Sequence, residues 1–182
     1  MTSPEATGVA PHLEARVGRA LGAVCRILAL AGGVVLTAIA LMTVVSIIGR
    51  GFSFAGLGPV PGDFELVEAG CAIAVFAFLP WCQYRRGHVT VDIFISRLPV
   101  RAQASLAMIG NIALTAAAGL IAWRLWFGML DKFSYGETTM ILGFKLGYAY
   151  AAAFPGAVFF ALVCLYTVWR SLNEAIRRQE TR

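Results

Sequence analysis

Charged residues are scarce in this chain. Of its 182 residues only 14% are Asp, Glu, Lys or Arg, whereas 59% are hydrophobic. An average soluble domain has roughly 25% charged and about 45–50% apolar residues, so this composition excludes an ordinary soluble fold and indicates an integral membrane protein. The net charge of +5 does not indicate nucleic-acid binding, because the basic residues lie between apolar runs and not on one soluble face.

Residues that carry catalysis or hold metals are also few. Only two histidines are present, His12 near the N-terminus and His88 between two apolar runs, so neither can ligate a haem at membrane depth. The sequence has no G-x-S-x-G, H-E-x-x-H or G-x-x-x-x-G-K-[ST] pattern. Its four cysteines form no C-x-x-C pair and lie in or beside apolar runs, which is typical of small buried side chains. We therefore expect no catalytic residue, no cofactor and no metal site.

Long apolar runs, in contrast, are abundant. A helix needs about 20 apolar residues to cross a hydrocarbon core of roughly 30 Å. Four runs have that length, at about 27–49, 64–84, 102–127 and 147–169. The first could be a signal peptide, but it exceeds the roughly 7–15 residues of a signal core, so we expect a retained span. The sequence predicts one all-α membrane domain of four transmembrane helices over 1–182, with mobile ends at 1–11 and 177–182.

The Lys and Arg residues predict how the spans are oriented. Eleven of the fifteen lie before the first span, between the second and third spans, or after the fourth; the other four are Arg50, Arg124, Lys132 and Lys145. Cytoplasmic segments are enriched in Lys and Arg, so both termini and the second connection are predicted to be cytoplasmic.

The second connection begins with the sequence RRGHVTVD. His88, Thr90 and Asp92 alternate with apolar residues, as in a strand, but an open strand edge cannot be left in lipid. We therefore expect an extended turn and then a short interfacial helix from about Asp92 to Leu98, with Asp92 as its N-cap and Pro99 at its end.

The second span begins with a cluster of acids. Asp63 is predicted to be the N-cap, and Glu65 and Glu68 follow where acids complement the helix dipole. Glu68 could be a coupling carboxylate of a proton- or cation-driven carrier, because an ionisable group in a membrane is a functional hypothesis by default. The interpretation we favour is that Glu65 and Glu68 share one face and pair with Arg50 at the interface or with a partner subunit.

Other polar and small residues predict helix packing. Asn111 and Thr115 are four residues apart in the third span and can hydrogen-bond another helix. The pairs Gly18/Gly22 and Gly143/Gly147 have G-x-x-x-G spacing, but both lie at or beyond span ends and are a weak signal.

The order of these features resembles a known family. Arg50 ends the first span, FELVE (64–68) begins the second, RRGHVTVDIFISRLP (85–99) follows it, and GETTMILG (136–143) precedes the fourth. This order is similar to that of the small, DctQ-like membrane subunit of tripartite ATP-independent periplasmic (TRAP) transporters.

The resemblance implies a set of partners and roles. It implies a bacterial inner-membrane location beside a large multispan permease subunit (DctM-like), which carries the substrate and sodium sites, and a periplasmic solute-binding protein (DctP-like). It also implies a non-catalytic scaffold role in sodium-driven uptake of an organic acid. Arg50, Glu65 and Glu68 would then lie near the outer surface, where they could brace the first two spans or meet the binding protein. Arg85, Arg86, His88 and Asp92 would hold membrane lipid headgroups or the large subunit.

A second functional hypothesis belongs to another class. The chain could be a self-sufficient small carrier, or another accessory membrane protein, acting as a homo-oligomer. Uptake by liposomes that hold this protein alone would favour that hypothesis. A complex with a large membrane subunit, with no transport by this chain alone, would favour the scaffold.

Overall fold

The computed structural model describes residues 11–85 and 100–180. It contains four long helices and one short 3-10 turn: α1 (Pro11–Gly51), η1 (Ser53–Ala55), α2 (Asp63–Tyr84), α4 (Val100–Tyr135) and α5 (Leu146–Glu180). The described ranges contain no strand, and only Thr138 and Lys145 form an isolated bridge. The expected interfacial helix at 92–98, with Asp92 and Pro99, lies outside the described residues.

All four long helices can cross a membrane by their length and composition, which confirms the predicted all-α, four-span fold. At 1.5 Å per residue the 22 residues of α2 extend about 33 Å, close to the hydrocarbon thickness. The 41 residues of α1 extend about 60 Å, so this helix begins well before the apolar run that starts at Ile27. Likewise α4 continues to Tyr135, and Trp123 and Trp126 lie within it and not at its end.

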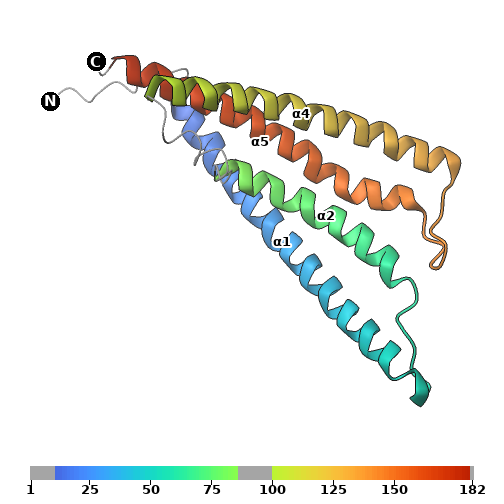
Figure 1. The fold of residues 1–182 in the computed structure, drawn as a ribbon. Coiled ribbons are helices and arrows are strands. Elements are labelled where there is room, and N and C mark those ends of the chain that lie inside the picture. The colour runs from blue at the N-terminus through green and yellow to red at the C-terminus, as the bar shows by residue number, and fades with distance from the viewer. Residues whose placement is uncertain (1–10, 86–99, 181–182) are drawn as a thin grey trace.

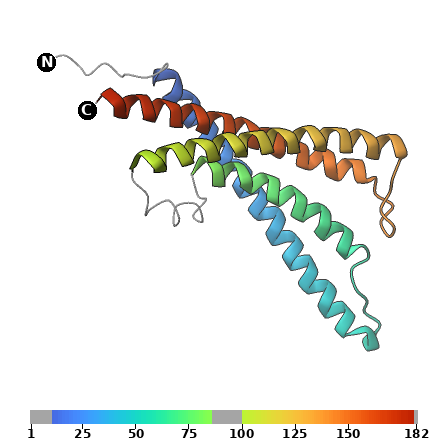
Figure 2. The ribbon, with the colours of Figure 1, turned by 45° about the horizontal axis from the view of Figure 1, so that its top comes forward.

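The helices form two hairpins that spread apart like a fan (Figure 1). At one end α1 begins and α5 finishes, and we call this the terminal end. At the other end lie the α1–α2 connection and the 136–145 loop, and we call this the loop end. The hairpins converge toward the terminal end and separate toward the loop end, as the turned view also shows (Figure 2). The packing order is α1, α2, α5, α4, so the two inner helices hold the hairpins together.

Small residues allow α1 and α2 to pack closely within the first hairpin. A Cβ added at Gly32 of α1 would lie 2.8 Å from the Cβ of Ala77, and one at Gly70 of α2 would lie 2.8 Å from Ile39. Aromatic contacts hold the second hairpin together, where the rings of Trp126 and Phe154 lie 5.2 Å apart. Small side chains are the usual means of close helix approach in membranes, where no hydrophobic driving force acts between helices.

The two hairpins meet through α2 and α5, which run parallel. A Cβ added at the buried Gly156 of α5 would lie 2.8 Å from the backbone oxygen of Phe76, so the two backbones are almost in contact there. Nearer the terminal end, Nε2 of Gln83 donates to Oγ1 of Thr167 at 2.8 Å, and both residues are buried. A buried amide needs such a partner, and this bond fixes the register of the two helices.

At the terminal end, α1 also reaches α5. Gly18 and Gly22 leave room for the hydroxyl ends of Tyr166 and Tyr84, since a Cβ at either glycine would lie within 2.7 Å of a tyrosine oxygen. One turn earlier in α1, the Glu14 carboxylate accepts a hydrogen bond from Nδ2 of Asn173 at 2.8 Å. The Gly18/Gly22 spacing, a weak signal in the sequence, therefore marks a real helix contact.

Candidate functional site

The charged residues of the loop end bring α1 and α2 together. Oδ2 of Asp63 accepts hydrogen bonds from Oγ of Ser46 at 2.6 Å and from the Arg50 guanidinium at 3.3 Å. The backbone N–H of Val60 donates to the same Ser46 hydroxyl at 3.2 Å. Arg50 therefore pairs with Asp63, and the expected pairing of Arg50 with Glu65 and Glu68 is wrong within this chain.

The role predicted for Asp63 as N-cap is also wrong. The N-cap of α2 is Gly62, which adopts φ 72°, and Asp63 is the first residue inside the helix. The left-handed conformation at Gly62 is costly for a residue with a Cβ, and a Cβ there would also lie 2.4 Å from Leu142. The Asp63 carboxylate therefore has two roles: Oδ1 accepts the backbone N–H of Phe64 in its own helix at 2.9 Å, and Oδ2 binds Ser46 and Arg50 of α1.

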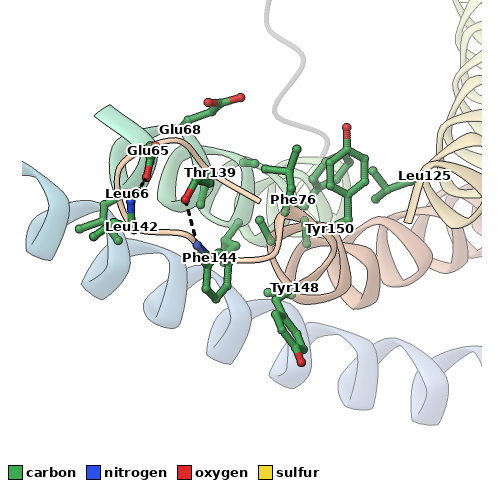
Figure 3. Close-up of a pocket in the computed structure, with 17 residues that line it drawn as sticks. Glu65, Leu66, Glu68, Phe76, Leu125, Thr139, Leu142, Phe144, Tyr148 and Tyr150 are labelled. Carbon is green, nitrogen blue, oxygen red and sulfur yellow. Dashed lines mark hydrogen bonds between the residues drawn. The ribbon is translucent and has the colours of Figure 1, made fainter. Parts of the chain in front are cut away.

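Glu65 joins the first hairpin to the second. Its two carboxylate oxygens accept the backbone N–H groups of Ile141 at 2.8 Å and Leu142 at 3.1 Å, both in the 136–145 loop. Figure 3 shows the bond to Leu142. We call this pair of hydrogen bonds the Glu65 latch. It is the contact at the loop end that holds the start of α2 against the connection between α4 and α5.

The 136–145 loop is itself well ordered by internal hydrogen bonds. The amide of Thr139 donates to the carbonyl of Phe144 at 2.8 Å, and the amide of Phe144 donates to Oγ1 of Thr139 at 3.1 Å. Gly136 and Gly143 both adopt positive φ at its two ends. At the α4 side, Lys132 forms an ion pair with Glu137. The resulting tight turn aims its central amides at Glu65 and leaves Met140 fully exposed.

Glu68, three residues beyond Glu65, has a different environment. It is exposed and makes no hydrogen bond or ion pair with any residue in the ranges 11–85 and 100–180. In Figure 3 its carboxylate points away from Thr139 and Leu142, which surround Glu65. Two carboxylates that share a helix face in the sequence are therefore distinct in the structure, one bound to loop amides and one open to a partner.

An open groove lies between α2 and α5 below the latch. Its volume is about 620 Å³. Alanines and aromatic residues form most of the lining, and Glu65 and Glu68 are the charged groups that border it. Phe76 and Ala153 lie at its deep end, next to the close approach of Gly156 to Phe76. The groove is thus bounded by the helix crossing on one side and by the Glu65 latch on the other.

The remaining residues singled out in the sequence lie toward the terminal end. Arg85 follows the last residue of α2, is exposed, and places its guanidinium 5.5 Å from the Trp81 ring. Arg86, His88 and Asp92 lie outside the described residues. Nδ2 of Asn111 on α4 donates to Oγ of Ser171 on α5 at 3.0 Å, whereas Thr115 donates to the carbonyl of Asn111 on its own helix at 2.7 Å.

The spans contain little that could perform chemistry at membrane depth. Between Arg26 and Arg50, between Glu68 and Arg85, and between Leu146 and Trp169 the sequence has no charged residue. Within the described ranges no three His, Cys, Asp or Glu residues gather as a metal site would require. The buried polar groups that sequence patterns missed, Gln83 and Thr167, bond to each other and so act in packing. Their types alone could not show which helix they would meet.

The comparison with known families identifies the chain. A family model described as "Tripartite ATP-independent periplasmic transporters, DctQ component" matches residues 39–174, about three quarters of the sequence. The chain belongs to the DctQ family. The searches of curated proteins and of solved structures gave no match. The DctQ match includes Arg50, the Glu65 latch and the groove, whereas the Gly18/Gly22 contact precedes it.

Membership of the DctQ family confirms the resemblance found in the sequence motifs. The chain is a multi-pass membrane protein and a component of a TRAP transporter. In this chain the FELVE and GETTMILG segments are in contact, because Glu65 of the first accepts hydrogen bonds from backbone amides of the second. Two motifs that are more than seventy residues apart thus form one contact at the loop end.

Proposed function

We propose that the chain is a non-catalytic scaffold subunit that holds the large permease subunit of a TRAP transporter in the membrane. The single observation that carries the proposal is the exposure of its spans. In the most apolar parts of α1 and α4 only 6% of residues are buried inside the chain, so these helices present long apolar faces outward. Lipid can cover such a face, but a subunit of a membrane complex needs one for its partner.

The distribution of charge supports a scaffold over a carrier. A coupling ion crossing the membrane needs ionisable or polar groups along its path. The centres of the first, second and fourth spans carry no charged residue. In the proposed assembly, sodium coupling and organic-acid binding belong to the large subunit and to the periplasmic binding protein.

The proposed location is the bacterial inner membrane, with both termini in the cytoplasm. Four spans put the start of α1 and the finish of α5 at the same end of the molecule (Figure 1). In the sequence, eleven of the fifteen Lys and Arg residues precede the first span, separate the second from the third, or follow the fourth, as expected of cytoplasmic segments. The loop end, with Arg50, Asp63 and the Glu65 latch, would then face the periplasm, where a binding protein delivers its solute.

Co-purification tests the proposal. The tagged chain, expressed together with the large membrane subunit encoded in the same organism, should purify as a one-to-one complex that survives size-exclusion chromatography. A second measurement tests whether α1 contacts the partner. The double variant Val34→Ser with Leu41→Ser, which replaces two exposed apolar residues of α1, should then weaken the complex. Purification of the chain only as a homo-oligomer, with the large subunit in a separate peak, would contradict the proposal.

A further inference from the structure

The groove between α2 and α5 has the features of a lipid site. It lies beside the Glu65 latch in the half of the molecule nearer the loop end, and a volume of about 620 Å³ is within the roughly 300–1,000 Å³ of sites for small molecules. Its floor combines the small side chains of Ala69, Ala72 and Ala149 with the larger Ile73 and Phe76. Such a floor is apolar, as the binding site of a hydrocarbon chain must be.

The rim of the groove carries an uncompensated negative charge. No Lys or Arg belongs to the lining, and Glu65 already accepts two backbone N–H groups in the latch. Glu68 has no partner among the described residues and stands at the edge of the groove, with the Tyr150 hydroxyl pointing to the same side in Figure 3. The rim therefore favours a ligand group that is cationic and donates hydrogen bonds.

Depth in the membrane places this carboxylate where lipid headgroups lie. Glu68 is five residues from the start of α2, about 7–8 Å along the helix axis. Its side chain tilts toward the N-terminus of the helix, and hence back toward the membrane surface. Phe76, at the deep end of the groove, lies about 12 Å further in, where acyl chains are found.

We propose that this groove binds a phospholipid with a primary ammonium headgroup, its ammonium on Glu68 and one acyl chain along the alanine floor. A primary ammonium donates charge-assisted hydrogen bonds to a carboxylate, whereas a quaternary ammonium has no N–H to donate. Phosphatidylethanolamine should therefore bind better than phosphatidylcholine of the same acyl chains, although both headgroups are zwitterionic. The proposal needs only the membrane-spanning fold and is independent of the scaffold role.

Native mass spectrometry tests the site directly. The full chain, in the assembly with which it purifies, is titrated with phosphatidylethanolamine or phosphatidylcholine of matched acyl chains, and the retained lipid is counted. The wild type should retain roughly five times as much phosphatidylethanolamine as phosphatidylcholine. This ratio is somewhat smaller than the one expected from a full hydrogen bond to a charged group. In Glu68→Gln the ratio should fall to about one. The control Asp131→Asn, which removes an exposed carboxylate on α4 outside the groove, should keep the wild-type ratio.

A second variant tests where the acyl chain lies. Ala72→Phe fills the floor without changing a charge, and it should lose retention of both lipids while its helical circular dichroism stays that of the wild type. Equal retention of the two lipids by the wild type, or a preference that persists in Glu68→Gln, would overturn the proposal. So would unchanged retention in Ala72→Phe. Retention of neither lipid by the wild type would also show that the lipid assignment is wrong.

Discussion

Substitution of Gly156 by alanine should separate the two hairpins. The added Cβ would lie 2.8 Å from the backbone oxygen of Phe76 and 3.0 Å from its carbonyl carbon, whereas ordinary contacts begin near 3.4 Å. Backbone atoms cannot rotate away as a side chain can, so α2 and α5 must shift by several tenths of an ångström. Overpacking of this kind costs typically about 1–3 kcal/mol, against about 1 kcal/mol gained from the better helix propensity of alanine.

The matched control is Gly119→Ala on α4. A Cβ at Gly119 meets nothing within 4 Å, so this variant gains helix propensity without a clash. In thermal melts of the purified chain in detergent, Gly156→Ala should melt up to roughly 8 °C below the wild type, and Gly119→Ala above it. Identical melting of the two variants would refute the claim that a close backbone contact between α2 and α5 joins the hairpins.

Three further substitutions test other contacts. Glu65→Ala should speed amide hydrogen exchange at Ile141, whereas Glu68→Ala should leave it unchanged, because only Glu65 binds the loop amides; equal exchange in both would argue against the latch. Gln83→Ala should lower the free energy of unfolding by about 1–3 kcal/mol, measured by chemical denaturation, since it removes a buried hydrogen bond. Gly22→Ala should destabilise less than Gly156→Ala in the same melts, because the clashing atoms belong to the end of a tyrosine side chain that can move.

The sequence was sufficient to predict the number and approximate position of the spans. Hydrophobic length is a local property, and the run at 64–84 coincides with α2 to within a residue. Helix ends were harder to predict where polar residues extend a helix beyond the hydrocarbon core. The start of α1 at Pro11 and the finish of α4 at Tyr135 are examples, because there the helix continues after the apolar run has ended.

Pairings between distant residues could not be predicted from the sequence. Three acids at the start of the second span, Asp63, Glu65 and Glu68, were candidates to pair with Arg50. The structure shows that its partner is Asp63. The choice depends on Ser46 of α1, which also donates to Asp63, and on the 136–145 loop, whose amides occupy Glu65. A sequence does not show which backbone N–H groups will be available as donors. From the sequence alone, a carboxylate that binds such groups therefore cannot be distinguished from one that pairs with a Lys or Arg side chain.

The family adds a role to this geometry. The chain is a DctQ component of a TRAP transporter, and in the scaffold role proposed above its two long, sparsely buried spans would face the partner. The Glu65 latch joins the two hairpins at the loop end, and the Gly156 contact joins them deeper along α2 and α5. Contacts of this kind would suit the scaffold role proposed for the chain.

Solute uptake into liposomes is the most direct test of the scaffold claim. Liposomes would hold either this chain alone or the chain with the large membrane subunit, with the binding protein, a labelled organic acid and a sodium gradient supplied in both cases. The account predicts sodium-dependent uptake by the two-subunit liposomes and none above protein-free liposomes by the chain alone. Uptake by the chain alone would contradict it.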